Sequence, residues 1–90
     1  MPHYRVLLTV LPRPELLDPE GETIGQAIRK LGVPAVYGVR AGRAFELRLE
    51  APSAEAAQQT AKMLAERLLH NPIVEIYQLQ ALEEITPSVH

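Results

Sequence analysis

Residues 39–50 read VRAGRAFELRLE, and the second half of this stretch alternates between apolar and charged side chains. A recurrence at every second position is the period of a β-strand that buries one face. The stretch therefore predicts a strand in the middle of a small sheet, with its apolar face in the core. The apolar positions of this strand are Phe45, Leu47 and Leu49.

The residues just upstream continue the alternation, because Tyr37 and Val39 lie at odd-numbered positions, as do the apolar residues of the strand. Two arrangements keep the apolar face whole. One is a hairpin with a three-residue connection over 41–43, which pairs Val39 with Phe45, and the other is a single long strand bent at Gly42. We favour the hairpin. In both arrangements two arginines and a glycine lie at an exposed bend where a partner can bind; these are Arg40, Gly42 and Arg43.

The size and composition of the chain indicate one small domain over residues 1–90. A chain of this length buries only about 60–65% of its unfolded surface, so association with other chains would stabilise it. Apolar residues make up 47% of the chain, which excludes disorder, and a net charge of −2 gives no reason to expect nucleic acid as a partner. There is no cysteine, no run of about 18 apolar residues that a membrane span needs, and no signal-peptide layout at the start. We therefore expect a cytoplasmic protein without membrane contact.

Two helices are predicted, one on each side of the central stretch. Asp18 is a suitable cap before Pro19, apolar residues follow at helical spacing over 24–31, and Gly32 is the expected stop. Ser53 is the expected cap of the second helix. The second helix should end at His70-Asn71-Pro72.

Strands are predicted at the two ends of the chain, over residues 4–11 and 73–83, with a frayed tail over 84–90. The last strand has an unusual pattern, because Val74 and Ile76 point one way whereas the apolar residues after them point the other. Either a bulge exchanges the faces or both faces are partly buried. Together with the first strand, it predicts a second apolar patch that needs a partner. The patch consists of Leu7, Leu11, Tyr77 and Leu79.

The predicted order of elements is β-α-β-β-α-β, an α+β fold in which two helices cover one face of an antiparallel sheet. This is a ferredoxin-like layout. The second apolar patch, on the uncovered face, predicts a homodimer or a dimer of dimers.

A search for reactive groups predicts no catalytic, cofactor-binding or metal site. The histidines do not have the spacing of metal ligands, no base lies near either serine, and the glycines do not form a phosphate-binding loop. These residues therefore indicate a binding or scaffold domain. The histidines are His3, His70 and His90, and the serines are Ser53 and Ser88.

Three stretches are similar to one known family: 17–32 (LDPEGETIGQAIRKLG), 39–47 (VRAGRAFEL) and 68–77 (LLHNPIVEIY). Each is moderately specific, but together they follow the order and spacing of the PurS family, the small subunit of phosphoribosylformylglycinamidine synthase. The resemblance covers nearly the whole chain. A proline-rich loop after the first strand and Ile76, where many relatives have an acidic residue, are slight departures.

The resemblance implies a role in purine biosynthesis, in a complex that converts formylglycinamide ribonucleotide to the amidine with ATP and glutamine. A PurQ-type glutaminase subunit would release ammonia, and a PurL-type synthetase subunit would use it with ATP and Mg²⁺. The small subunit would bridge the two as a dimer and assist ammonia transfer without a catalytic residue or cofactor of its own.

A different class of protein has the same order of elements. Stand-alone ACT-like modules bind small effectors and also form dimers, and a fold does not fix a function. A bound amino acid near residues 18–22 would favour this alternative.

Overall fold

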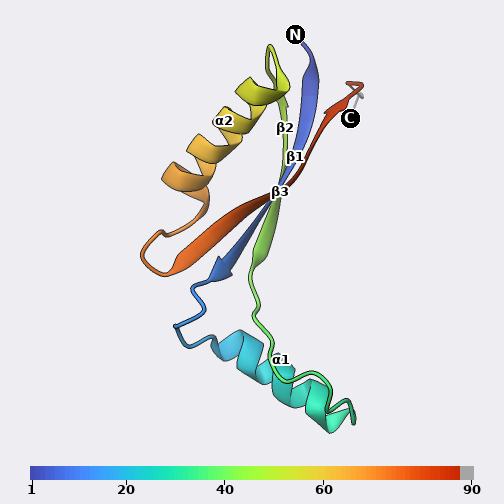
Figure 1. The fold of residues 1–90 in the computed structure, drawn as a ribbon, viewed down its shortest axis with the longest axis vertical. Coiled ribbons are helices and arrows are strands. Elements are labelled where there is room, and N and C mark those ends of the chain that lie inside the picture. Colours follow the sequence, from blue (N-terminus) through green and yellow to red (C-terminus); the bar gives the residue numbers. More distant parts are fainter. Residues whose placement is uncertain (88–90) are drawn as a thin grey trace.

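A three-stranded antiparallel sheet forms the centre of the computed structural model, which describes residues 1–87. The central strand β1 (His3–Pro12) pairs with β2 (Arg43–Glu50) along one edge and with β3 (Glu75–Ile85) along the other. The spatial order is therefore β2-β1-β3 (Figure 1). This confirms the α+β class with an antiparallel sheet.

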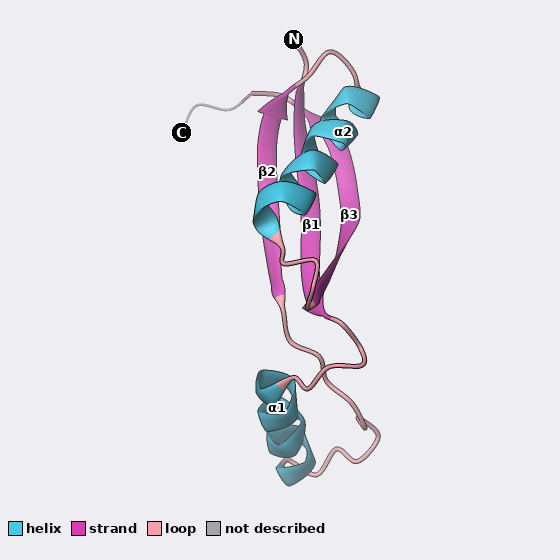
Figure 2. Ribbon diagram, turned by 90° about the vertical axis from the view of Figure 1, so that its left-hand side faces the viewer, coloured by secondary structure: helices cyan, strands magenta, loops and turns pink. Residues whose placement is uncertain are grey.

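One face of the sheet is covered by α2 (Ala54–Leu64), which crosses it diagonally (Figure 2). The helix contacts the sheet through alanines at every fourth position, and Ala57, Ala61 and Ala65 have no exposed surface. Such small side chains let the helix lie close to the strands. The hydroxyl of Ser53 accepts a hydrogen bond from the Ala56 amide at 3.1 Å, so the predicted cap is confirmed. The buried side chains of β1 below the helix are Tyr4, Val6, Leu8 and Val10.

The last turn of this helix widens into a π-helix, η1 (Ala65–Leu69). His70 ends it in an extended conformation, and its Nδ1 lies 2.5 Å from the carbonyl oxygen of Ala65. Asn71 follows without the left-handed conformation expected there, since no residue other than glycine has a positive φ in the described chain. Its side-chain oxygen instead accepts a hydrogen bond from the Ile73 amide at 3.1 Å.

A β-bulge explains the unusual pattern of the last strand. Leu7 lies opposite Ala81 and Leu8 lies opposite Leu79, so Gln80 is the extra residue in β3. The bulge was one of the two predicted explanations. The bulge places Tyr77 and Leu79, which precede it, and Leu82, which follows it, on the same face of the sheet, toward α2. Strand β3 continues to Ile85, two residues into the stretch expected to fray, and the other end of that stretch, 88–90, lies outside the described residues.

The predicted hairpin is wrong within one chain. Strand β2 begins at Arg43, and residues 36–42 have no regular secondary structure. They continue beyond the end of the sheet, because β1 ends at Pro12 and offers no further partner. The observed order is therefore β-α-β-α-β, with three strands in place of the four predicted.

Helix α1 (Pro19–Lys30) lies beyond the end of the sheet and does not cover it (Figures 1 and 2). The prediction of two helices on one face is therefore wrong for α1. Its local signals are confirmed, since Asp18 caps the helix through the Gly21 amide at 3.1 Å and Gly32 has a φ of 84°. The chain is elongated, at 50 × 29 × 21 Å, with a radius of gyration of 16.7 Å. A compact domain of this length would have a radius of about 12 Å.

None of the helices formed by residues 1–87 is long and apolar enough to cross a lipid bilayer.

Candidate functional site

The two arginines of the predicted exposed bend are both bound within the chain. Arg43 forms a bidentate ion pair with Glu75, with Nη1–Oε2 and Nη2–Oε1 distances of 2.7 and 2.9 Å. Its Nη2 also donates to the Leu69 carbonyl at 3.2 Å, and its guanidinium lies 5.8 Å from the centre of the Phe45 ring. The hydrogen bonds with Glu75 raise the pKa of Arg43, and those from Arg43 lower the pKa of Glu75. Arg43, which the sequence placed at an exposed bend for a partner, therefore contributes to the fold of its own chain.

Arg40 fastens the bend to the end of β1, because its Nη2 donates to the carbonyl of Pro12. The neighbouring Ala41 amide donates to Asp18 Oδ2 at 2.8 Å. This hydrogen bond is the largest cause of the lowered pKa of Asp18, followed by the bond from the Gly21 amide. Gly42 is required here for steric reasons, since a Cβ atom would collide with the carbonyl of Val10.

The four residues of the predicted second apolar patch do not lie together. Leu7 and Leu11 lie on the open face of the sheet, whereas Tyr77 and Leu79 pack against the core under α2. The bulge at Gln80 causes this separation. Tyr77 also donates to Glu66 at 2.9 Å and meets the His70 ring edge-on at 4.9 Å. Burial first, and then the bond to Glu66, raise the pKa of Tyr77.

The open face of the sheet carries more charge than the sequence pattern indicated. Arg5 binds Glu46 at 2.9 Å and Glu83 at 3.3 Å, and Glu46 also binds Arg48 at 3.0 Å. The bond from Arg5 is the main cause of the lowered pKa of Glu46, with a second from Arg48. The apolar side chains of this face include Leu7 and Leu11.

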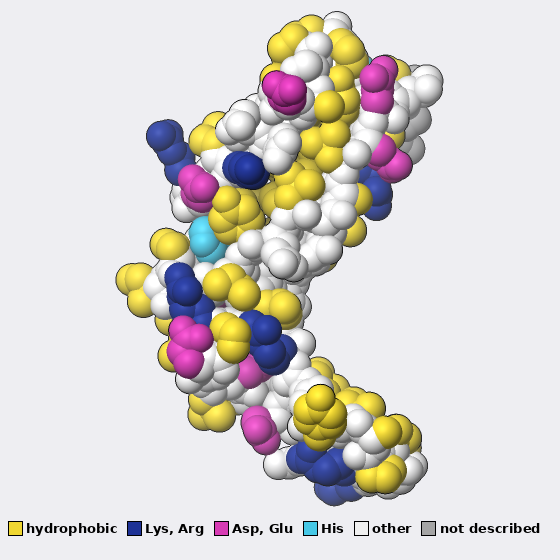
Figure 3. All heavy atoms as spheres, in the orientation of Figure 1, with side chains coloured by type: hydrophobic (Ala, Val, Ile, Leu, Met, Phe, Trp, Pro, Cys, Tyr) yellow, Lys and Arg dark blue, Asp and Glu magenta, His cyan; other side chains and the backbone are white. Residues whose placement is uncertain are grey.

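The two most exposed of the large apolar side chains, Leu31 and Tyr37, lie in a part of the chain that the sequence pattern placed in the core. We call residues 18–41, which comprise α1 and the extended segment after it, the arm. On the arm, Ile24 is 40% exposed, Leu31 is 81% exposed and Tyr37 is 95% exposed. Figure 3 shows hydrophobic atoms gathered at this end of the molecule. The helical periodicity of the stripe is the same whether its partner is the same chain or another, so the sequence pattern contains no signal that separates the two.

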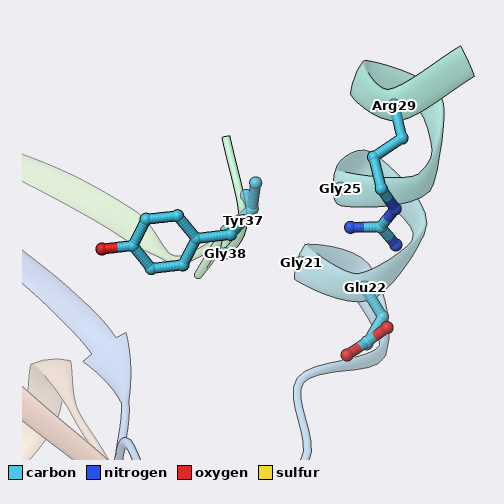
Figure 4. A pocket seen from close by; sticks show the side chains of 7 residues that line it. Gly21, Glu22, Gly25, Arg29, Tyr37 and Gly38 are labelled. Carbon is cyan, nitrogen blue, oxygen red and sulfur yellow. The ribbon is translucent and has the colours of Figure 1, made fainter. Parts of the chain in front are cut away.

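A depression of about 70 Å³ lies between α1 and residues 37–39 (Figure 4). Gly21 and Gly25 face Val39 across it, and a Cβ on Gly21 would collide with the Val39 carbonyl. Gly21 therefore serves the close packing of the arm. The depression is far smaller than the roughly 300–1,000 Å³ of a typical small-molecule site, although it lies where an ACT-like effector would be expected.

Residues 1–87 contain no group of three or more histidine, cysteine or acidic side chains that could hold a metal ion. His3 lies 3.4 Å from Glu50, His70 is a helix cap, and His90 is outside the described residues. Among the serines, Ser53 caps α2, and Ser88 is likewise outside this range. The geometry defines a small α+β binding domain whose most exposed apolar surface belongs to the arm.

Comparison with known proteins assigns the family. The family model for PurS, described as phosphoribosylformylglycinamidine (FGAM) synthase, matches residues 5–83. The chain is 38% identical over 88 residues to the PurS subunit of Synechocystis, covering 94% of this chain and 86% of that one. It is 37% identical over 83 residues to the PurS subunit of Thermotoga maritima, covering 91% and 100%. The chain therefore belongs to the PurS family, the family of the small subunit of FGAM synthase in purine biosynthesis.

Solved structures of this family have the same fold. PurS of Thermus thermophilus superposes with a TM-score of 0.87 at 34% identity, covering 94% of this chain and all of that one. A chain in a structure of PurLQS from Thermotoga maritima superposes with a TM-score of 0.82 at 36% identity, again covering 94% and 100%. The elongated monomer with α1 beside the sheet's end is thus part of a fold shared with PurS structures.

Proposed function

We propose that the chain is the non-catalytic small subunit of an FGAM synthase complex, where it bridges a PurQ-type glutaminase subunit and a PurL-type synthetase subunit. Its role is to hold the two in place so that ammonia released by the glutaminase reaches the synthetase. The observation that carries this proposal is the family match over residues 5–83 together with the likeness to a chain of the PurLQS structure over 94% of the length.

The chemistry of the described residues supports a scaffold role. The strongest polar contacts are ion pairs and caps that stabilise the fold, such as Arg43 with Glu75 and Asp18 with Ala41. We propose that ATP and Mg²⁺ are used on the large subunit and that this chain holds no cofactor. The expected location is the cytoplasm, where a biosynthetic ligase complex acts.

The surfaces that meet the partners are also a proposal. Arg40 uses one nitrogen on Pro12, so its guanidinium still has donors for a carboxylate of a partner. Leu7 and Leu11, on the open face, are the second candidate contact. Arg43 is less suited, because Glu75 and Leu69 already occupy it.

The decisive experiment is reconstitution of amidine formation from the purified PurL-type and PurQ-type subunits of the same organism. We expect the chain to be needed when glutamine is the nitrogen source and to be dispensable when ammonium chloride replaces it. The reason is that ammonia from solution reaches the synthetase without a bridge. The chain alone should hydrolyse neither ATP nor glutamine.

Two results would refute the proposal. One is glutamine-dependent turnover that is the same with and without the chain. The other is ATPase, glutaminase or amidine-forming activity of the isolated chain.

A further inference from the structure

The turn between η1 and β3, residues 70–74, is held by hydrogen bonds along its backbone. Asn71 lies at the centre of these bonds, since its side-chain oxygen accepts the Ile73 amide and its carbonyl accepts the Val74 amide, both at 3.1 Å. Arg13 binds the turn from the end of β1. Its amide donates to the Val74 carbonyl at 2.9 Å, and its Nε donates to the Ile73 carbonyl at 3.2 Å. These contacts fix the shape of the turn.

Two large apolar side chains at this turn are left in solvent. Leu68, in η1, is 74% exposed, and Ile73 is 80% exposed. In the shared orientation of Figures 1 and 3, the turn is at the left-hand edge of the molecule, where hydrophobic atoms lie beside Lys and Arg side chains. A single exposed apolar residue is common on any protein surface. Here the backbone that carries the two is already ordered, so a partner that binds them has little ordering entropy to offset.

Cationic side chains flank the turn, although the whole chain has a net charge of −2. Arg67 is exposed and Arg13 binds backbone carbonyls, and within residues 1–87 neither forms an ion pair. The acidic residues of the adjoining helix and strand are engaged elsewhere, because Glu66 accepts a tyrosine hydroxyl at 2.9 Å and Glu75 binds Arg43. The two free arginine charges are therefore available to carboxylates of a partner, which guanidinium groups bind well.

The combination of apolar anchors and a charged rim indicates a protein partner. Interfaces are stabilised mainly by a few side chains that fill a pocket of the partner, surrounded by polar contacts that exclude water. Nucleic acid and anionic membranes instead require many cations, since each phosphate contact needs its own Lys or Arg. Two free arginines on an acidic chain are too few for either. The complementary surface is an apolar groove with carboxylates along its border.

We propose that the turn after η1 docks into an acidic-bordered apolar groove on a larger subunit of the FGAM synthase complex. Leu68 and Ile73 fill the groove, and Arg13 and Arg67 bind the carboxylates at its border. The partner is taken from the complex of the proposed function, so the inference rests on that function. The turn lies at the β3 edge of the sheet, opposite β2.

The test is a titration of the chain into purified synthetase and glutaminase subunits of the same organism, with glutamine-dependent turnover as the readout. Ile73→Glu should raise the concentration of chain that gives half-maximal turnover by about tenfold or more, because burial of an isoleucine is lost. Leu68→Glu should act in the same direction. Both side chains are exposed in the single chain, so circular dichroism should be unchanged. The matched control is Gln59→Glu, which adds the same charge at an exposed position of α2 and should titrate like the parent.

A second set of variants tests the acidic border of the groove. Arg67→Glu should weaken the titration by about tenfold or more, and Arg67→Gln should weaken it less, because only the former places a like charge against the partner's carboxylates. Sodium chloride should weaken the parent more than it weakens Arg67→Gln, since salt screens the contact that this variant lacks. If Arg67→Glu titrates like the parent, the border is not acidic and the proposal is wrong.

The outcomes separate this inference from the proposed function. Curves of Ile73→Glu and Leu68→Glu that coincide with the parent's would overturn the docking surface and leave the proposed function intact, because the parent still supports turnover. If the parent itself does not support glutamine-dependent turnover, the proposed function fails and the docking surface fails with it. A lower mass of free Ile73→Glu in sedimentation would also overturn the inference, since the turn would then contact a second copy of the chain.

Discussion

Arg43 and Glu75 are the first residues of β2 and β3, and their bidentate ion pair joins these two strands across the end of β1. The Glu75 carboxylate also accepts the Asn71 amide at 2.8 Å, and Arg43 binds the Leu69 carbonyl, so the same pair fixes the turn after η1. The exposed fraction is 50% for the Arg43 side chain and 16% for Glu75. An arginine that the sequence placed at a solvent-exposed bend is thus part of the fold.

Arg43→Ala should destabilise the fold. Because half of the Arg43 side chain is in water, which screens the ion pair, we expect a loss of about 1 kcal/mol in the free energy of unfolding. Urea denaturation measures this value, and Arg67→Ala, at an exposed position of η1, is the control. A stability equal to that of the parent chain would show that the Arg43–Glu75 ion pair does not stabilise the fold.

The stability of the chain should depend on pH through Glu75. Its pKa in the folded state is lowered, chiefly by Arg43 and then by the Asn71 amide, below the value of about 4.3 in an unfolded chain. The stabilisation is therefore present above pH 4.3 and is lost as the pH falls through the folded-state pKa. The free energy of unfolding of Glu75→Gln, measured from pH 7 to pH 3, should fall less steeply than that of the parent. Parallel curves would contradict the assignment.

Gly42→Ala should be harmful whereas Gly38→Ala should not. A Cβ at position 42 collides with the Val10 carbonyl, and a Cβ at position 38 meets nothing within 4 Å. Overpacking of this kind costs about 1–3 kcal/mol. Thermal unfolding of the two variants side by side checks the prediction, which fails if they melt at the same temperature.

Asp18→Ala should loosen the arm without affecting the sheet. The carboxylate accepts the amides of Gly21 and Ala41, so its removal frees both. We expect faster hydrogen exchange over residues 19–24 and 39–42, with unchanged protection of β1. Ser53→Ala, which removes the cap of α2, is the matched control and should leave the arm's exchange rates as they are. Unaltered exchange of the Ala41 amide in Asp18→Ala would show that the contact does not hold the arm.

Reconstitution with Arg40→Ala tests the proposed docking contact. We expect the variant to keep its fold and to bind the large and glutaminase subunits more weakly, since a truncated interfacial charge pair costs about 2–5 kcal/mol. Pull-down and glutamine-dependent turnover give the readout. A variant that assembles like the parent would show that Arg40 binds the Pro12 carbonyl of its own chain and does not contribute to docking.

The sequence by itself determined the local elements and the absence of a recognisable reactive motif. The caps at Asp18 and Ser53, the strand over 43–50 and the face change in the last strand are encoded by residues close together in the chain. Each could therefore be predicted from spacing and cap chemistry. The three PurS-like stretches likewise sufficed to assign the family.

Only the tertiary structure decided where these elements lie. A hairpin and a single strand bent at Gly42 give the same alternation of apolar and polar residues. The apolar stripe of α1 likewise has the same period whether it covers its own sheet or another. The register at the Gln80 bulge is set by the pairing of β3 with β1, and the Arg43–Glu75 ion pair joins β2 to β3. Both depend on residues that are distant in sequence. Local patterns specify which face of an element is apolar but not what covers it. The position of the arm, and the placement of Leu7 and Tyr77 on opposite faces of the sheet, therefore depend on the long-range contacts of the fold.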